Sequence, residues 1–359
     1  MGCQAAISRS KRSSQSRPTS SLETASASSA NRSSAQDSLV VIIRTDTGLY
    51  GVGECDANPW MAKACIEAPG THTMGLSIRD MLIGADPFAI GELWRQAYLG
   101  TAMNGRRGMV IHALSAVDMA LWDLCGKAVG LPVHELLGGA KRDTIVPYAS
   151  LLPAGNRFAL YRDALCAAAE QAVNLGFRAV KAEVILNGPY AHDGMQESDD
   201  RHTEVVAAVR QTIGPDVTLM VDVGYLWEDA ERCLATIAEW AEFDLFFLET
   251  PIWSDNLHEI ATVCEQAPMP IAYGEWLATR FEFEEAMDIG HIHVAQPDVG
   301  RVGGIGEAKI VCDMAKARGR NRDAQHAAEL ADRVVGARRL PLLLRADGRE
   351  DDVRDGREV

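Results

Sequence analysis

The stretch Leu219-Met-Val-Asp222 is the first of three short apolar runs that each end in an acidic residue, and the other two close at Glu249 and Glu275. Each run has the length and composition of a buried β-strand, and each is followed by a loop and a helical pattern. This order predicts a parallel βα sheet with one carboxylate at the carboxyl end of three successive strands. In a βα barrel such strand ends meet on one face, where active sites are built. The stretch therefore predicts three carboxylates that converge on one site.

Converging carboxylates repel one another strongly unless a cation lies among them. Oxygen ligands on rigid strand ends favour a hard cation, and Mg²⁺ is the first candidate. The three acids Asp222, Glu249 and Glu275 therefore predict a site for one Mg²⁺.

The same βα pattern extends on both sides of these three runs. Strand candidates alternate with helical patterns and lie at 145–151, 178–184, 217–223, 245–249, 270–275 and 291–297. Two amphipathic helices between them are expected at 159–175 and 229–241. This repeat predicts an α/β fold in which residues 143–320 form strands one to six of a βα barrel.

Residues 39–142 lack this repeat and predict a separate α+β domain. Two strands at 39–44 and 49–54 flank a turn and form a hairpin, and a helix is expected at 110–126. Asp118 and Asp123 lie in that helix, where we expect helix caps and ion pairs to the adjoining domain rather than a catalytic role.

The two ends of the chain depart from both patterns. Residues 1–38 are rich in Ser and Arg and poor in large apolar residues, which predicts disorder, with an organellar transit peptide as the alternative. Residues 321–359 carry no recognisable seventh strand and have the composition of an aberrant tail. The barrel is therefore expected to be incomplete after strand six.

The overall composition narrows the class of protein. The chain has 359 residues, of which 47% are hydrophobic, and its net charge of −15 argues against a nucleic-acid-binding surface. The eight cysteines are scattered, as is typical of reduced thiols in a cytoplasmic protein, and no apolar run is long enough to cross a membrane. We expect a cytoplasmic homo-oligomer that acts on a small molecule.

Ordered motifs between residues 40 and 320 give the chain a resemblance to the mandelate racemase and muconate-lactonising branch of the enolase superfamily. Besides the three acids, these motifs are Gly51-Val-Gly-Glu54, Ala116–Asp123, Leu136–Gly139, Val180-Lys181, Gln296-Pro-Asp298 and Gly303-Gly304. The resemblance implies an N-terminal α+β capping domain over a modified TIM barrel, (β/α)7β, with one Mg²⁺ on the three acids. It also implies that a base on strand two or strand seven removes the proton α to a carboxylate.

Lys181 and Glu183 lie two residues apart on the second strand, so both side chains face into the barrel. The family often has Lys-x-Lys here, with the second lysine as a base, and this chain has Glu183 in that place. Lys181 is expected to hold the substrate carboxylate or to tune a neighbour, and Glu183 to accept a proton or hydrogen-bond a hydroxyl. The alternative is a buried ion pair between the two side chains.

Further candidates lie beyond the ends of later strands. The resemblance makes Asp298 the acid of an Asp–His dyad, against a helix N-cap as the alternative. The spacing of His326 would suit the partner, but residues 321–325 have no strand character, so His326 is expected to be a surface histidine. Trp276 either walls the substrate pocket or packs in the core. Arg301 either binds an anionic substrate or pairs with a neighbouring acid, and His192 is expected in a solvated loop.

The resemblance, together with these residues, implies an enzyme that uses Mg²⁺ to remove the proton α to the carboxylate of a sugar acid. The enediolate would then lose water to give a 2-keto-3-deoxy acid, because a single base suits dehydration whereas racemisation wants a base on each face. One alternative is a racemase or epimerase of the same family. The others are an inactive, truncated or frame-shifted homologue that lacks the dyad histidine, and a metal-binding module without catalysis.

Overall fold

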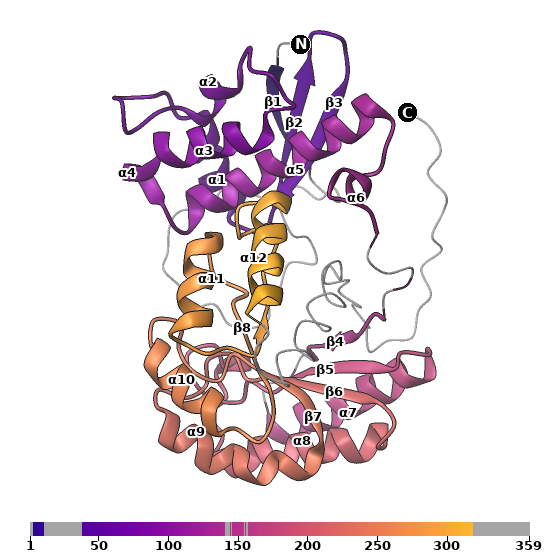
Figure 1. Cartoon of the computed structure of the whole chain (residues 1–359). Helices are drawn as coiled ribbons and strands as arrows, with labels where there is room; N and C mark the ends of the chain where they lie inside the picture. The colour runs from indigo at the N-terminus through magenta and orange to yellow at the C-terminus, as the bar shows by residue number, and fades with distance from the viewer. Residues whose placement is uncertain are drawn as a thin grey trace, which may run out of the picture.

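The structure is a computed structural model that describes residues 3–10, 38–140, 144, 146–153, 155 and 157–318. Figure 1 shows two layers: an N-terminal domain of helices and a small sheet above, and a parallel sheet with its helices below. Two helices near the end of the described chain, α11 and α12, stand between these layers. The two-domain plan thus follows the change of pattern seen in the sequence.

In its described residues, the N-terminal domain has one antiparallel sheet and six helices. Its strands are β1 (Cys3–Ser10), β2 (Ser38–Thr45) and β3 (Tyr50–Cys55), in the order β1-β2-β3. Its helices are α1 (Pro59–Glu67), α2 (Ile78–Leu82), α3 (Ile90–Gly100), α4 (Ala102–Gly105), α5 (Met109–Val129) and α6 (Val133–Leu136). The predicted hairpin and the predicted helix are confirmed.

The long helix α5 packs directly on strand β3, and two glycines of the strand allow this close approach. A Cβ atom on Gly51 would lie 1.9 Å from the carbonyl oxygen of Ala120, and one on Gly53 would lie 2.0 Å from that of Ala116. Any larger residue would collide with the helix backbone. The Gly51-Val-Gly53 motif is therefore a packing requirement of this domain.

Strand β1 differs from the disorder expected across residues 1–38. Cys3–Ser10 pairs antiparallel with the whole of β2, from Cys3 opposite Thr45 to Ser10 opposite Ser38. Without this pairing, one edge of β2 would present its backbone N–H and C=O groups unpaired. A backbone ladder satisfies these groups whatever the side chains, which is why composition alone did not predict the strand.

The barrel domain contains one sheet of six parallel strands that follow one another in sequence order. The strands are β4 (Ala149–Leu151), β5 (Ala179–Glu183), β6 (Thr218–Asp222), β7 (Leu245–Glu249), β8 (Ile271–Tyr273) and β9 (Val294–Ala295). The helices are α7 (Phe158–Asn174), α8 (Asp199–Ile213), α9 (Ala230–Ile237), α10 (Leu257–Gln266), α11 (Thr279–Asp288) and α12 (Ile305–Ala317), with short 3₁₀ helices η2 (His192–Gly194) and η3 (Ala238–Phe243). All six predicted strands are confirmed, and each lies within or close to its expected range.

The sheet does not close into a complete barrel within the described residues. Its outer members are β4 and β9, and no strand among residues 157–318 joins them. The predicted aberrant tail, 321–359, lies outside the described residues, as does His326. The fold is that of a modified TIM barrel with an N-terminal cap, of which strands one to six are seen.

Side chains alternate across the strands and form layers inside the sheet. The inward-facing floor is apolar and comprises Ala179, Met220, Phe247, Ala272 and Val294. Above it, toward the carboxyl ends of the strands, the same inward face carries acids. The apolar floor thus supports a charged upper layer.

Helix α5 is long and apolar enough to cross a membrane by length and composition alone, but 72% of that stretch is buried inside the fold. Its buried residues include Ile111, Leu114 and Leu124, which belong to the core of the N-terminal domain. A buried core helix of this kind can have the same length and apolar composition as a membrane span.

The N-terminal domain holds the loop before α12 through three hydrogen bonds. Trp94 Nε1 donates to the carbonyl of Gly303 at 2.8 Å, and the Gly303 N–H donates to Ser115 Oγ at 2.9 Å. The Gly306 N–H donates to Asp118 Oδ2 at 3.1 Å. Asp118 therefore caps α12 from the adjoining domain, as predicted.

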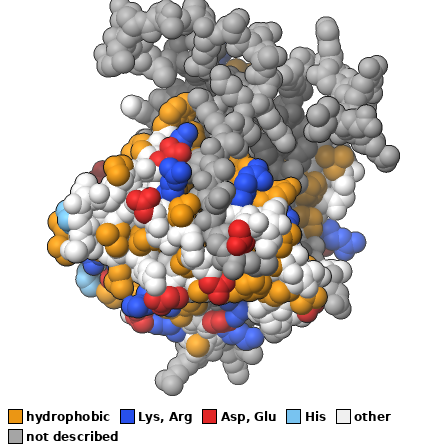
Figure 2. Space-filling view, turned by 90° about the horizontal axis from the view of Figure 1, so that it is seen from above, with side chains coloured by type: hydrophobic (Ala, Val, Ile, Leu, Met, Phe, Trp, Pro, Cys, Tyr) orange, Lys and Arg blue, Asp and Glu red, His pale blue; other side chains and the backbone are white. Residues whose placement is uncertain are grey.

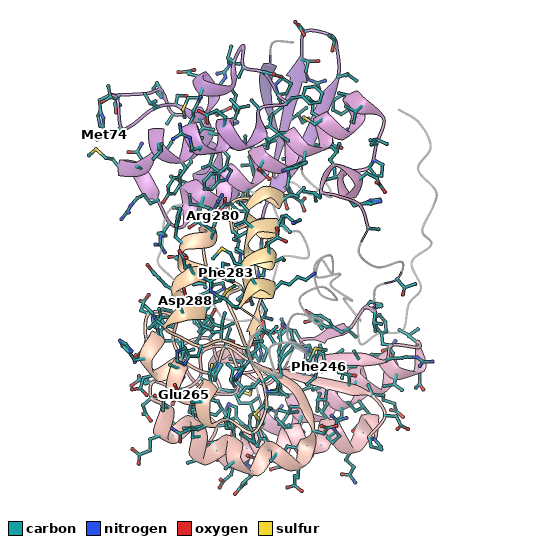
Figure 3. All side chains as sticks on the ribbon, in the orientation of Figure 1. Met74, Phe246, Glu265, Arg280, Phe283 and Asp288 are labelled. Carbon is teal, nitrogen blue, oxygen red and sulfur yellow. The ribbon has the colours of Figure 1, made fainter. Side chains whose placement is uncertain are left out.

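Helices α11 and α12 are joined by a partly buried ion pair close to the domain junction. Arg280, at the end of α11 nearer the N-terminal domain in Figure 3, donates from Nε to Glu307 Oε1 at 3.0 Å.

Figure 2 views the molecule from the N-terminal domain and shows acidic and basic side chains interspersed with hydrophobic ones. Neither sign of charge dominates the described part of that face.

Candidate active site

Three acids lie side by side on neighbouring strands at the carboxyl end of the sheet. Glu183 is in register with Asp222, and Asp222 is in register with Glu249. All three side chains are buried, with Glu183 at 7%, Asp222 at 4% and Glu249 at 1% exposure. The outward-facing neighbours Val221 and Leu248 pack in the hydrophobic core. Alternation along the strands therefore directs three carboxylates into the barrel.

Glu275 lies close to this row, although it is not part of a strand. Strand β8 ends at Tyr273, and Gly274 then adopts a φ of +118°, which takes Glu275 into the following loop. Its Oε1 atom is 3.4 Å from the hydroxyl of Tyr225. The expectation that Glu275 ends a strand is thus corrected to a loop position two residues further on.

The ammonium group of Lys181 lies against two of the predicted metal ligands. Its Nζ atom is 2.7 Å from Glu249 Oε2 and 3.4 Å from Asp222 Oδ2. Lys181 is in register with Met220, one step before the acidic row, so its side chain reaches up from the apolar floor. The ion-pair alternative had Glu183 as its partner, whereas these hydrogen bonds go to the other two acids.

The pKa values of Glu249 and Lys181 are both shifted by the negative charge of neighbouring carboxylates. Burial and the charges of Asp222 and Glu275 raise the pKa of Glu249, Lys181 lowers it, and the net result is a pKa of about 7. Burial by itself would lower the pKa of Lys181, but Glu249 and Asp222 outweigh it and hold this pKa above its ordinary value. One lysine therefore faces more buried negative charge than it can neutralise.

This donor set fits a hard divalent cation, because it is made of carboxylate oxygens with surplus negative charge. Asp222 Oδ1 is fixed by the N–H of Gly224 at 3.0 Å and the hydroxyl of Thr250 at 2.9 Å, which leaves Oδ2 directed toward Lys181. Within the described residues, no three acidic, His or Cys side chains form a ready-made metal cluster. The lysine ammonium instead lies between two of the acids.

Two residues beside the acids adopt the left-handed conformation that favours glycine. Tyr225 has a φ of 61° and Thr250 a φ of 49°. The Tyr225 N–H donates to the carbonyl of Thr250 at 2.7 Å, so the two strained residues support each other. Such strain is typical of functional sites. Sequence reasoning missed both residues, although each lies within three positions of a predicted ligand.

Asp298 and Arg301 lie in the loop after β9 and face the N-terminal domain. Asp298 Oδ1 accepts the N–H of Gly300 at 2.7 Å. The guanidinium of Arg301 binds Asp56 Oδ2 at 2.6 Å and lies 3.9 Å from Asp298 Oδ2. Of the two alternatives for Arg301, the structure shows pairing with a neighbouring acid. His326, whose spacing would suit a dyad with Asp298, lies outside the described residues.

His192 and Trp276 both take part in ring packing. The imidazole of His192 stacks on Tyr161, with ring centres 5.1 Å apart, so it is less solvated than expected. Trp276 is partly buried and packs on Tyr225 at 4.3 Å, beside Glu275. Trp276 therefore lies next to the acids, and part of it belongs to the core.

Comparison with known proteins agrees with this architecture. The family description "Mandelate racemase / muconate lactonizing enzyme, N-terminal domain" matches residues 17–138, and "Enolase C-terminal domain-like" matches residues 164–330. The first match begins inside the segment expected to be disordered. Together the two matches cover most of the chain.

Similar proteins include several that act on sugar acids. The arabinonate dehydratase of Saccharolobus solfataricus is 32% identical over 77% of this chain and 69% of its own length. The D-galactarolactone cycloisomerase of Agrobacterium fabrum is 30% identical over 78% of this chain and 68% of its own length. A crystal structure of a racemase from Streptomyces coelicolor A3(2) with bound magnesium is 28% identical, with a TM-score of 0.68 over 79% of this chain and 78% of that one.

These matches, with the capped βα sheet and its acidic row, define an enzyme of the enolase superfamily. The chain belongs to the mandelate racemase/muconate lactonizing enzyme family. Because its relatives are dehydratases, cycloisomerases and racemases, its own class of reaction is that of a lyase or an isomerase.

Proposed function

We propose that this protein uses Mg²⁺ to abstract the proton α to the carboxylate of a sugar acid, and that the product is a 2-keto-3-deoxy acid. The observation that carries the proposal is the buried row of Glu183, Asp222 and Glu249 beside Glu275. Relatives named as dehydratases of sugar acids support the substrate class.

Asp222, Glu249 and Glu275 would hold the metal ion. When bound, Mg²⁺ would stabilise the extra negative charge that the substrate carboxylate gains as its α proton leaves. Thr250 and the Gly224 N–H would keep Asp222 oriented for this role. Lys181 would place a second positive charge against the same acids, or against the substrate carboxylate.

Glu183 is the proposed proton acceptor on this face of the substrate. It points into the barrel from the position next to Asp222, and a buried carboxylate can remove a proton when the substrate is held against it. Lys181 does not suit this role while it is paired with two acids, because its raised pKa keeps it protonated. Loss of the β-hydroxyl with a proton, as water, then completes the dehydration, and Asp298 would be the dyad acid that orients the base of the opposite face.

Racemisation or epimerisation remains the alternative outcome within this family. It would require a second proton-carrying group on the far side of the substrate. The strand expected to carry that group follows β9, and residues 319–359 lie outside the described part of the chain. The inactive-homologue alternative makes the opposite prediction, that no sugar acid is turned over at all.

The test combines metal binding with turnover. Titration of Mg²⁺ into the metal-free protein should show one binding site, and Asp222→Asn should weaken it by about 100-fold or more. Glu183→Gln, which is close in shape, should keep Mg²⁺ affinity while it lowers kcat on a sugar acid about 10²- to 10⁴-fold.

Two results would contradict the proposal. If Asp222→Asn binds Mg²⁺ as tightly as the wild type, the three acids are not the metal site. If the wild-type protein with Mg²⁺ forms no 2-keto acid from any member of a panel of aldonates, aldarates and uronates, the inactive homologue is the better account.

A further inference from the structure

Four aromatic side chains gather at the carboxyl ends of the strands, and we call them the aromatic cluster. They are Tyr190, Tyr225, Trp253 and Trp276, and each comes from a different one of the four consecutive loops that follow β5, β6, β7 and β8. Four separate loops therefore converge to build one aromatic surface on the face that carries the acids.

The rings contact one another as a compact group. Tyr225 and Trp276 have ring centres 4.3 Å apart, and Tyr190 meets Trp276 edge to face at 5.1 Å. Tyr190 and Trp253 lie nearly parallel, with centres 6.1 Å apart and an angle of 12° between the planes. Offset and edge-to-face packing of this kind holds rings in fixed orientations.

The cluster is continuous with the proposed metal site. The hydroxyl of Tyr225 lies 3.4 Å from Glu275 Oε1, and Trp276 directly follows Glu275 in the chain. A substrate whose carboxylate binds a metal ion held by the acids would therefore extend its remaining atoms toward these rings. Tyr225 and Trp276 are therefore the members of the cluster that lie next to the proposed metal ligand Glu275.

The outer side of the cluster is open to solvent. Tyr225 is only 3% exposed, whereas Tyr190 is 43% and Trp253 is 38% exposed. Exposed aromatic rings grouped beside a site are an unfavourable surface unless a ligand covers them. Ligand sites commonly combine such aromatic walls with a few fixed polar groups, which is the arrangement here.

We propose that the aromatic cluster binds the part of the substrate remote from its carboxylate, and that it selects sugar acids closed into a ring. A ring acid presents a flat face of C–H groups with its hydroxyls at the rim, which suits packing on an indole or phenol face. An open-chain acid carries hydroxyls along both sides and would have to desolvate them there. This inference rests on the proposed function, because it assumes that Mg²⁺ held by the acids binds the substrate carboxylate.

The experiment compares two six-carbon acids that differ in ring closure. The two ligands are galacturonate, in its pyranose form, and open-chain galactonate. Each is titrated into the Mg²⁺-loaded protein carrying Glu183→Gln, because this change prevents turnover. Trp253→Ala in that background should weaken galacturonate binding about tenfold and galactonate binding less than about twofold. Trp253→Phe keeps a ring and should retain most of the affinity.

Phe88→Ala serves as the matched control, because Phe88 is also a half-exposed ring but lies in the N-terminal domain. It should leave both affinities unchanged. If both acids bind and Trp253→Ala weakens them equally or not at all, the ring-selecting subsite is wrong while the proposed function stands. If neither acid binds the Mg²⁺-loaded protein, the proposed function fails together with the subsite.

Discussion

The ammonium of Lys181 lies 2.7 Å from Glu249 and 3.4 Å from Asp222, inside a site in which all three side chains are buried. The lysine comes from the layer below the acids, and its length lets it reach both carboxylates. In the absence of a metal ion, Lys181 is thus the positive charge that these two acids share. This contact makes the stability of the metal-free protein depend on a residue at the centre of the site.

Replacing Lys181 with methionine should destabilise the metal-free protein strongly. The change keeps most of the side-chain volume but leaves two buried carboxylates without their counter-charge, and removal of one partner of a buried pair costs about 3–5 kcal/mol. Urea unfolding in the presence of a chelator would measure the loss. Added Mg²⁺ should stabilise Lys181→Met more than the wild type. Its binding stabilises the native state, and in the variant it also replaces the missing counter-charge of the two carboxylates.

Lys309→Met is the control for this prediction, since Lys309 forms an exposed ion pair with Asp313 on α12. Exposed pairs contribute about 1 kcal/mol or less, so this variant should unfold nearly as the wild type does. If Lys181→Met in the presence of chelator is as stable as Lys309→Met, the lysine does not neutralise the acids.

The hydroxyl of Thr250 should set the affinity for Mg²⁺ through its hydrogen bond to Asp222 Oδ1. Thr250→Val removes this donor and keeps the branched shape, so the Kd for Mg²⁺ should rise about tenfold. Thr250→Ser keeps the hydroxyl and should bind like the wild type. Equal affinities for the Val and Ser variants, measured by calorimetry, would show that the hydrogen bond has no such role.

Asp118 should give the folding stability a dependence on pH. Its pKa in the folded protein is about 7, above the ordinary aspartate value of about 3.9, because burial raises it more than the N–H groups of Gly306 and Ile305 lower it. Between these values the folded protein holds a proton that the unfolded chain has released, so stability falls as pH rises, by up to about 1.4 kcal/mol per pH unit.

Asp118→Asn cannot ionise and should flatten this slope in urea unfolding measured from about pH 4 to about pH 8. Asp123→Asn is the matched control, because Asp123 lies on the same helix but is partly exposed and paired with Lys127. A slope that is the same in Asp118→Asn as in the wild type would refute the prediction.

Gly53→Ala should destabilise the N-terminal domain, because the added Cβ would lie 2.0 Å from the carbonyl oxygen of Ala116 on α5. The obstacle is helix backbone and cannot rotate away, so the loss should be about 3 kcal/mol in thermal or urea unfolding. Gly91→Ala, on α3, has open space around its Cβ and should be neutral or stabilising by up to about 1 kcal/mol. Similar stabilities of the two variants would contradict the packing argument.

Much of the fold could be read from local patterns. The apolar runs that end at Asp222 and Glu249 became strands β6 and β7 with the acids facing inward, because side chains alternate along a strand. The expected hairpin before residue 56 also formed. Glu275 was placed close to, though not at, a strand end, since a glycine with positive φ precedes it.

Other features had no local signal. Strand β1 forms because the edge of β2 offers a backbone ladder, and a Ser- and Arg-rich composition does not reveal that partner. Arg301 could have met a substrate or an acid, and only the approach of the two domains brought Asp56 to it.

By itself, the sequence determined the family, the order of the strands and the inward-facing acids Asp222 and Glu249, because each follows from short-range periodicity and from residues at fixed positions. Only the tertiary structure decided that Lys181 lies between Glu249 and Asp222, and that Tyr190, Tyr225, Trp253 and Trp276 form one surface. The physical reason is that these contacts join side chains from different strands and loops. Their distances depend on how the βα units pack together, and no local pattern along the chain records that packing.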